Sequence, residues 1–184
     1  MTRQLIKNII GVTCISFGFA TFTSCEPDDV CLAKEAPFVS VEMLYPNSTI
    51  PLEDTIYYKA YINDSVLIGE GNALNKSSFN LPIQIAENNT ITYVLQQGKT
   101  YNTTQIIGND TIIREHIAPV DTLTVTYAID NKYDSKACGF GIYFKDATFN
   151  LRSTNWIQNI ETVNNTIDNA TTTNIYFFAE PRNN

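Results

Sequence analysis

Four cysteines and one histidine are the residues of this chain best suited to redox, metal or nucleophilic chemistry. Cys25 and Cys31 lie six residues apart near the N-terminus, Cys14 precedes them, and Cys138 stands alone in the second half. A zinc site would need these thiols and His116 at short, regular spacings, and the sequence has none. His116 is also not accompanied by a Gly-x-Ser-x-Gly elbow, so we expect no catalytic residues, no cofactor and no metal.

The start of the chain accounts for Cys14. Arg3 and Lys7 are cationic, residues 9–22 are apolar, and two small residues follow. These 14 residues would rise only about 21 Å as a helix, which is short of a hydrocarbon core of roughly 30 Å. The pattern predicts a cleaved signal peptide over residues 1–24, and its removal would take Cys14 away.

The residues Phe22-Thr23-Ser24-Cys25 resemble a bacterial lipobox, with phenylalanine in place of the usual leucine. The resemblance implies that the Cys25 thiol receives a diacylglyceryl group and that Cys25 becomes the mature N-terminus. Acyl chains such as palmitate, at about 0.8 kcal/mol per buried methylene, would then hold the protein on the outer membrane. The acidic Glu26–Asp29 lies in a tether over residues 25–35 and also resembles the surface-export signal of Bacteroidota lipoproteins. We expect a cell-envelope lipoprotein that faces the periplasm or the cell surface.

The two remaining cysteines form a pair. With Cys14 removed and Cys25 acylated, Cys31 and Cys138 are left in an oxidising compartment. We predict a disulfide between them, and closing a loop of that length contributes about 4–5 kcal/mol by chain entropy. The alternative that the two thiols leave open is a metal site.

The charge of the chain bears on its partners. The sequence has 12 basic and 19 acidic residues, which gives a formal net charge of −7. Because Arg3 and Lys7 lie in the expected signal peptide, residues 25–184 carry 12 − 2 = 10 basic and 19 acidic residues. Their net charge is therefore −9. No basic patch marks a site for nucleic acid or anionic headgroups, so we expect no nucleic-acid partner. The membrane contact that we expect is the lipid anchor at Cys25.

Alternating apolar and polar residues dominate the chain after residue 35. Residues 38–45 place Val39, Val41, Met43 and Tyr45 on one face, and residues 121–129 place Leu123, Val125, Tyr127 and Ile129 on one face. Residues 105–113 predict a hairpin that turns at Gly-Asn-Asp, whereas residues 156–163 fit a strand or a short helix. Eight or nine such strands predict one all-β domain over residues 36–184, an antiparallel β-sandwich (Ig-like or jelly-roll-like) or a partly open barrel.

Aromatic and acidic clusters offer binding chemistry. Tyr57, Tyr58 and Tyr61 could stack on a sugar, although period-two alternation puts Tyr57 and Tyr61 on one face and Tyr58 on the other. Trp156 is expected in the core. Asp130–Asp134 lacks the spacing of a calcium loop, and we interpret it as a turn between strands.

Four triplets combine an aspartate, a hydroxyl residue and an apolar residue, which resembles the O-glycosylation sequon of Bacteroidota envelope proteins. The candidate acceptors are Thr55, Ser65, Thr111 and Thr122. An Asp-Thr pair also commonly passes from a turn into a strand, so a structural role is the alternative.

Three stretches resemble a Bacteroidota family of small lipoproteins known only as a domain of unknown function. They are "DDVC" at residues 28–31, "SKACGFGIYF" at residues 135–144 and "NWIQNIETVNNTIDN" at residues 155–169. The resemblance implies a periplasmic or surface lipoprotein and no activity. We therefore expect a non-enzymatic structural or binding module. A module that binds a glycan or an envelope protein is the alternative, and an enzyme with an unmarked pair of carboxylates is the third hypothesis.

Overall fold

The computed structural model describes residues 36–108, 110–168 and 172–182. These residues form eleven strands and no helix, and so contain no helix with the length and hydropathy that a membrane crossing needs. The strands are β1 Phe38–Leu44, β2 Asp54–Ile62, β3 Val66–Lys76, β4 Ser78–Pro82, β5 Thr90–Gln97, β6 Tyr101–Ile107, β7 Asp110–His116, β8 Val120–Ser135, β9 Gly139–Leu151, β10 Ile157–Thr162 and β11 Ile175–Ala179.

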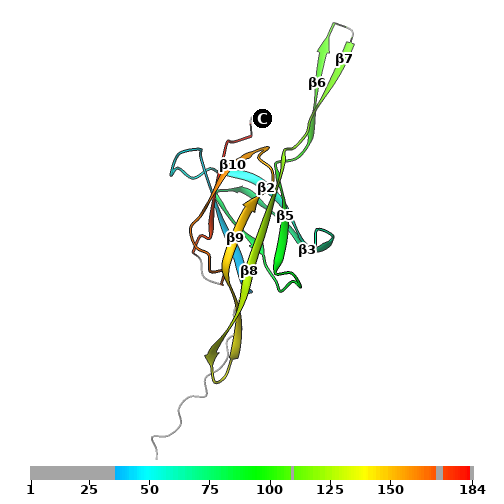
Figure 1. The fold of residues 1–184 in the computed structure, drawn as a ribbon. Coiled ribbons are helices and arrows are strands. Elements are labelled where there is room, and N and C mark those ends of the chain that lie inside the picture. The colour runs from blue at the N-terminus through cyan, green and yellow to red at the C-terminus, as the bar shows by residue number, and fades with distance from the viewer. Residues whose placement is uncertain (1–35, 109, 169–171, 183–184) are drawn as a thin grey trace, which may run out of the picture. The chain divides into compact units, whose positions relative to one another are not determined.

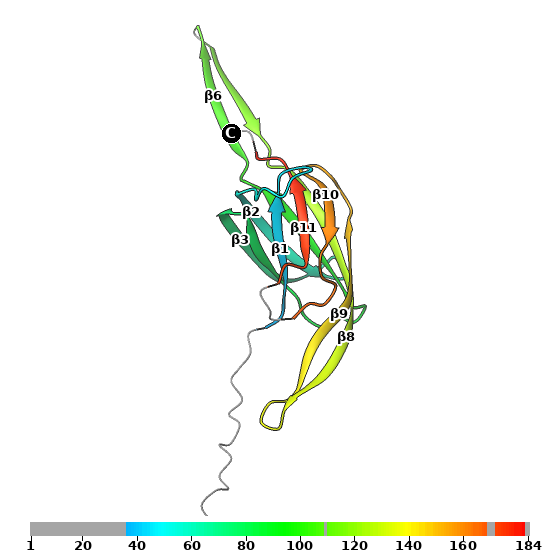
Figure 2. The same cartoon turned by 90° about the vertical axis from the view of Figure 1, so that its left-hand side faces the viewer.

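The strands form three sheets (Figure 1). Sheet A has the order β10-β11-β1-β4, sheet B has the order β3-β2-β5-β8-β9, and β6 and β7 pair only with each other. Sheet B curls around one side of sheet A (Figure 2). The predicted all-β sandwich is confirmed. Strands β1 and β11 are parallel, which departs from the antiparallel pairing of β4 with β1, β10 with β11, β3 with β2, β2 with β5 and β5 with β8.

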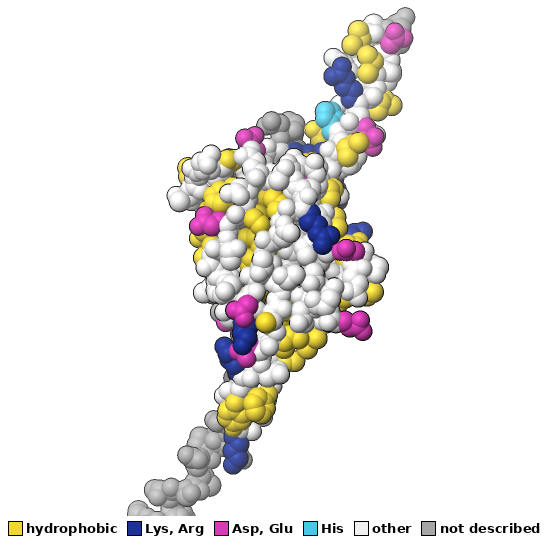
Figure 3. Space-filling view, viewed as in Figure 1, with side chains coloured by type: hydrophobic (Ala, Val, Ile, Leu, Met, Phe, Trp, Pro, Cys, Tyr) yellow, Lys and Arg dark blue, Asp and Glu magenta, His cyan; other side chains and the backbone are white. Residues whose placement is uncertain are grey.

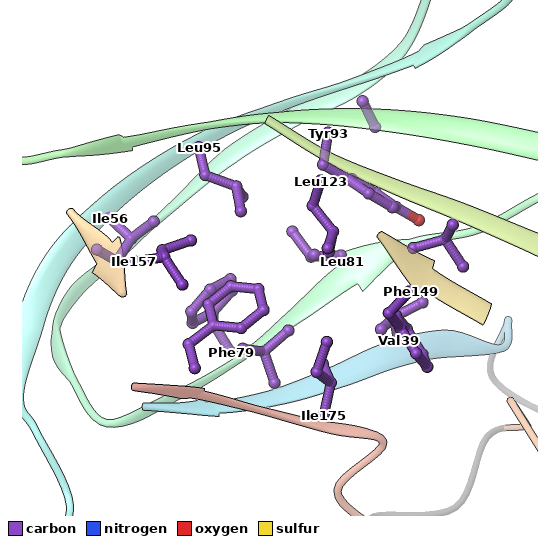
Figure 4. Packing of buried hydrophobic residues seen from close by; sticks show 14 of the residues in the cluster. Val39, Ile56, Phe79, Leu81, Tyr93, Leu95, Leu123, Phe149, Ile157 and Ile175 are labelled. Carbon is purple, nitrogen blue, oxygen red and sulfur yellow. The ribbon is translucent and has the colours of Figure 1, made fainter. Parts of the chain in front are cut away.

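The core fills the space between sheets A and B. Figure 4 shows Val39 and Ile175 of sheet A facing Tyr93 and Leu123 of sheet B. In β1 the predicted inner residues Val39, Val41 and Met43 are fully buried. Tyr45 is instead 37% exposed, because β1 ends at Leu44 and Tyr45 opens a turn that its carbonyl closes by accepting from the Ser48 N–H.

Two tyrosines tie sheet B to β4 and the segment after it. Tyr93 on β5 donates its hydroxyl to the Pro82 carbonyl at 2.7 Å, and Tyr127 on β8 donates to the Gln84 carbonyl. Burial raises the pKa of both phenols above the usual value, and the neighbouring Tyr127 and Tyr58 add to the shift at Tyr93. Leu123, Val125 and Tyr127 are buried along β8, as their alternation predicts, and Ile129 packs partly buried against the same core.

Two other sequence predictions concern short segments. Residues 105–113 form the predicted hairpin, in which Ile107 pairs with Asp110 and Gly108 takes a φ of 63°. Residues 156–163, which fitted either a strand or a short helix, contain strand β10. Its antiparallel pairing with β11 shows that they form a strand.

Asp130–Asp134 was expected to be a turn, and that prediction is wrong. These residues continue β8, which runs to Ser135 beside β9. Asp130 forms an ion pair with Lys145 on β9 at 3.4 Å, and the Lys132 ammonium lies 5.2 Å from the ring centroid of Tyr143. Such cross-strand pairs stabilise a continuous ladder where the local sequence alone is polar enough for a turn.

One buried carboxylate joins the two sheets at a corner. Asp121, at the start of β8 in sheet B, is fully buried. Its Oδ1 accepts the Asn155 N–H at 2.6 Å, and its Oδ2 accepts the N–H groups of Trp156 and Ile157 at 2.8 Å each. These residues lead into β10 of sheet A. Trp156 is buried as expected, and its indole donates to the Leu95 carbonyl of sheet B at 3.1 Å.

A buried amide starts the parallel pairing in sheet A. The side chain of Asn174 accepts the Ser40 N–H at 2.9 Å and donates to the carbonyls of Asn164 and Thr166. Its backbone N–H donates to the Ser40 carbonyl at 2.8 Å. One asparagine therefore fixes the loop before β11 against the edge of β1.

By their contacts, the described residues divide into a larger unit, residues 36–132 with 141–182, and a small unit, residues 133–140. Within the small unit the rings of Tyr133 and Phe140 meet edge to face at 5.6 Å, and both side chains are mostly exposed.

Candidate functional site

A groove of about 440 Å³ lies on the outer face of sheet B, over β2 and its neighbours β3 and β5. Its lining combines aromatic, amide, charged and small residues: Tyr57, Tyr58, Lys59, Glu70, Gly71, Asn72, Val94 and Gln96. This volume falls within the range of about 300–1,000 Å³ that is typical of small-molecule sites.

The register of the three strands places these side chains in two rows. Tyr57 pairs with Asn72 on one side and with Gln96 on the other. Lys59 likewise pairs with Glu70 and Val94, and the Lys59 ammonium lies 4.0 Å from the Glu70 carboxylate. The side chains of both partners are more than half exposed, so this pair adds little stability but leaves the groove with no net charge.

Tyr58 borders the groove too, but its side chain packs partly buried against the core, on the face of β2 opposite to that of Tyr57. This confirms the alternation predicted for the two residues. The ring of Tyr58 crosses β3 at Gly71, where a Cβ would lie only 2.5 Å from the Tyr58 hydroxyl oxygen. Gly71 must therefore lack a side chain, because the Tyr58 ring fills the space that a Cβ would need.

The hairpin β6–β7 and Ile117, the residue directly after it, carry five exposed isoleucines. The exposed fractions are Ile106 73%, Ile107 55%, Ile112 38%, Ile113 66% and Ile117 74%. The hairpin extends beyond the two main sheets (Figure 1), and hydrophobic side chains cover much of it in Figure 3.

Both faces of this hairpin carry exposed isoleucines. Cross-strand partners share a face, and Ile106 pairs with Thr111 while Thr104 pairs with Ile113. The opposite face carries Ile107 and Ile112, which pair with Asp110 and Gln105. The sequence predicts the hairpin, but the exposure of its isoleucines depends on where it leaves the sandwich.

Arg182 braces the base of the hairpin. Its guanidinium donates to the carbonyls of Gln97, Lys99 and His116 at 3.1, 2.6 and 3.1 Å. The guanidinium carbon also lies 5.2 Å from the ring centroid of Tyr101. A residue close to the C-terminus thus connects both strands of the hairpin to sheet B.

His116 lies at the end of β7, and its ring stacks on Tyr101 at a centroid distance of 4.6 Å. Its Nε2 is 3.0 Å from the Thr103 hydroxyl, and both side chains are exposed. This pair lies on an open ribbon rather than in a cavity. Among the described residues, no group of three or more His, Cys, Asp or Glu is placed to hold a metal ion.

The predicted covalent sites are only partly visible. Cys25 and Cys31 lie outside the described residues. Cys138 lies between β8 and β9 and is disulfide-bonded. The identity of its partner as Cys31 stays a prediction.

The four candidate glycosylation acceptors differ in their surroundings. Thr122 follows the corner aspartate Asp121, and its N–H donates to the Ser153 hydroxyl. The hydroxyl of Thr55 donates to the side chain of Asn75 at 3.1 Å. Both are half-buried, whereas Ser65 and Thr111 are exposed.

The aspartates of these triplets also differ in their surroundings. Asp54, before Thr55, accepts the Gln97 amide at 2.8 Å and the Arg182 backbone N–H at 3.2 Å. Asp64, before Ser65, lies in an exposed turn with a φ of 56°. Two triplets therefore have an evident structural use, and the triplets of Ser65 and Thr111 lie at hairpin turns.

The profile of a family of unknown function, DUF6452, matches residues 55–179, which is more than half of the chain. The chain belongs to the DUF6452 family. No curated protein and no solved structure matches it. The DUF6452 match includes the groove on sheet B, the hairpin β6–β7 and Asp121, and it begins beyond Cys25 and Cys31. The expected membership of a family of unknown function is confirmed.

Proposed function

We propose that this DUF6452 protein is a lipoprotein of the cell envelope, anchored in the outer membrane by acylated Cys25, and that its β domain is a non-enzymatic module that binds another envelope protein. The lipobox-like Phe22–Cys25 and the signal-like residues before it support the anchor. The observation that carries the binding role is the set of exposed isoleucines on the hairpin β6–β7.

The arrangement of these isoleucines favours a partner with an apolar cleft. A flat surface could cover only one face of the hairpin, but Ile106 and Ile113 lie on one face and Ile107 and Ile112 on the other. An isolated two-stranded hairpin is also marginally stable in water, and its open edges invite pairing. A cleft that encloses the hairpin would cover both faces and order the strands.

The hairpin is poorly suited to a lipid bilayer as its partner. Asp110 lies next to the turn at the tip, and Arg114 and Glu115 follow on the same strand. Charged side chains are costly in hydrocarbon, and the open strand edges would leave backbone N–H groups without acceptors there. A protein cleft can supply hydrogen-bonding or charged groups both to these side chains and to the open strand edges.

Photo-crosslinking in the native envelope tests the binding role. A crosslinking side chain placed at Ile112 probes one face of the hairpin and one placed at Ile113 probes the other, while the exposed Glu87 serves as the control position. We expect both hairpin positions, but not position 87, to form an adduct with the same envelope protein.

A substitution at the tip gives the size of the effect. Full burial of an isoleucine contributes about 1.5–3 kcal/mol, so Ile106→Ser at 73% exposure should lose about 1–2 kcal/mol of binding. That loss corresponds to roughly 5- to 30-fold weaker association. An adduct with lipid, an adduct only with a second copy of this chain, or no adduct at either face would contradict the proposal.

The anchor has its own test. Cys25→Ala in the full precursor should move the protein from the membrane fraction to the soluble fraction, because the acyl chains are then absent. Cys14→Ala is the matched control and should leave the distribution unchanged. Continued membrane retention of the Cys25 variant would exclude the lipid anchor.

We also propose Ser65 as the O-glycosylated position. Its triplet lies in the exposed turn between β2 and β3, and Asn63 and Asp64 there both have positive φ. A glycan at the other exposed acceptor, Thr111, would lie opposite Ile106 and obstruct one face of the hairpin. Peptide mass spectrometry of the native protein should show glycan mass at Ser65, and an unmodified peptide would remove this part of the proposal.

A further inference from the structure

The groove on the outer face of sheet B offers a second kind of binding, independent of the hairpin. It lies over the middle of a continuous sheet, where the strands fix the positions of its side chains. Sites on rigid strands hold their side chains more precisely than sites on loops do.

One wall of the groove is an aromatic ring flanked by two amides. The ammonium of Lys99 lies 5.3 Å from the centroid of Tyr57, which restrains this ring. Asn72 and Gln96 stand on either side of Tyr57 in the register of the sheet. The Gln96 amide nitrogen donates to the Gly98 carbonyl at 2.8 Å, and this bond fixes the side-chain amide of Gln96.

The other wall supplies a cation and an anion in equal number. Lys59 donates and Glu70 accepts hydrogen bonds, and at 4.0 Å from each other they cancel in net charge. A charged ligand gains no net attraction from this pair, because one partner repels the charge that the other attracts. A neutral ligand rich in hydroxyl groups can use both partners at once.

We propose that this groove binds a neutral saccharide, with one pyranose ring against Tyr57 and its hydroxyl groups bonded to Asn72, Gln96, Lys59 and Glu70. The apolar face of a pyranose suits an aromatic ring, and its hydroxyl groups both donate and accept, as the amides and the ion pair require. The site does not depend on the hairpin, so either proposal can fail alone.

Titration of the full chain with defined oligosaccharides tests the groove. The protein is kept in a detergent without sugar headgroups, and the probes are cellohexaose, chitohexaose and the anionic hyaluronan hexasaccharide. We expect at least one neutral probe to bind with a Kd below about 1 mM by calorimetry and the anionic probe to bind at least tenfold more weakly.

Two variants locate the binding. Tyr57→Ala should weaken the neutral probe at least tenfold, whereas Tyr61→Ala, four residues along the same strand and outside the groove lining, should change it less than twofold. In amide NMR spectra of the unmodified protein, the side-chain signals of Asn72 and Gln96 should shift on adding the probe. This measurement does not depend on whether the variants fold.

Several outcomes would overturn the saccharide site. They are no binding of either neutral probe at about 1 mM, equal binding by the Tyr57→Ala variant, and preference for the anionic probe. A short peptide that shifts the Asn72 and Gln96 signals when neither neutral sugar does would assign the groove to peptide instead.

Discussion

Removing one oxygen acceptor from the buried carboxylate of Asp121 should destabilise the whole sandwich. Asp121 accepts three backbone N–H groups at 2.6, 2.8 and 2.8 Å, and no water can replace it because its side chain is fully buried. In Asp121→Asn the amide NH₂ must face at least one of these N–H groups, so a bond is lost and two donors confront each other. Hydrogen bonds to a charged group contribute about 1.5–3 kcal/mol each.

We therefore expect Asp121→Asn to lower the free energy of unfolding by about 2–4 kcal/mol, out of the roughly 5–15 kcal/mol of a typical domain. With an m value of about 2 kcal/mol/M, the urea midpoint should fall by about 1–2 M. The fluorescence of Trp156 reports the transition close to the site of the change, since its N–H is one of the three donors.

The matched control is Asp130→Asn, which also removes one negative charge. Asp130 is partly exposed, and among the described residues its one ion pair is the 3.4 Å contact with Lys145. We therefore expect this variant to lose less than about 1 kcal/mol of unfolding free energy. If the two variants unfold at the same urea concentration, the idea that Asp121 holds the corner of the two sheets is refuted.

Three further predictions concern other parts of the domain. Tyr93→Phe should reduce the loss of stability at alkaline pH. Burial raises the phenol pKa in the folded state, so above pH ~10 only the unfolded chain releases the proton, which favours unfolding of the unmodified protein. The unmodified protein should lose about 1.4 kcal/mol more than the variant between pH 9 and pH 11 in urea titrations, and equal losses would contradict this. Gly71→Ala should cost about 1–3 kcal/mol, because its Cβ would meet the Tyr58 hydroxyl oxygen at 2.5 Å; an unchanged melting temperature would argue against that contact. Peptide mapping without reductant should link Cys31 to Cys138, and free thiols at both positions would exclude the disulfide.

Local sequence patterns predicted the parts of the fold that local physics controls. The alternation of Leu123, Val125 and Tyr127 predicts a strand with one buried face because side chains in a strand alternate between faces. The turn at Gly108 could be predicted for a similar reason, since few other residues adopt a positive φ there at low cost.

Features that depend on distant residues could not be predicted in this way. Asp110 and Asp121 begin equivalent triplets, yet one is exposed and the other binds three N–H groups, which lie 34 to 36 residues away. The groove likewise combines residues of β2, β3 and β5, and nothing near Tyr57 in the sequence indicates that Gln96 will lie beside it. The pairing of strands that are far apart in the sequence determines where these side chains lie, and local sequence patterns do not show that pairing.

The position of β1 within sheet A has a consequence for the time at which the domain can fold. β1 lies between β4 and β11, and the hydrogen bond from the Ser40 N–H to the Asn174 side chain joins residues 134 positions apart. A chain that emerges N-terminus first, from a ribosome or from a translocation channel, therefore presents β1 with an open edge until residues 175–179 have appeared. Contacts of such long range slow folding, and sheet A stays incomplete until β11 has emerged. The predicted acylation of Cys25 would then take place while β1 still lacks β11 as its neighbour in sheet A.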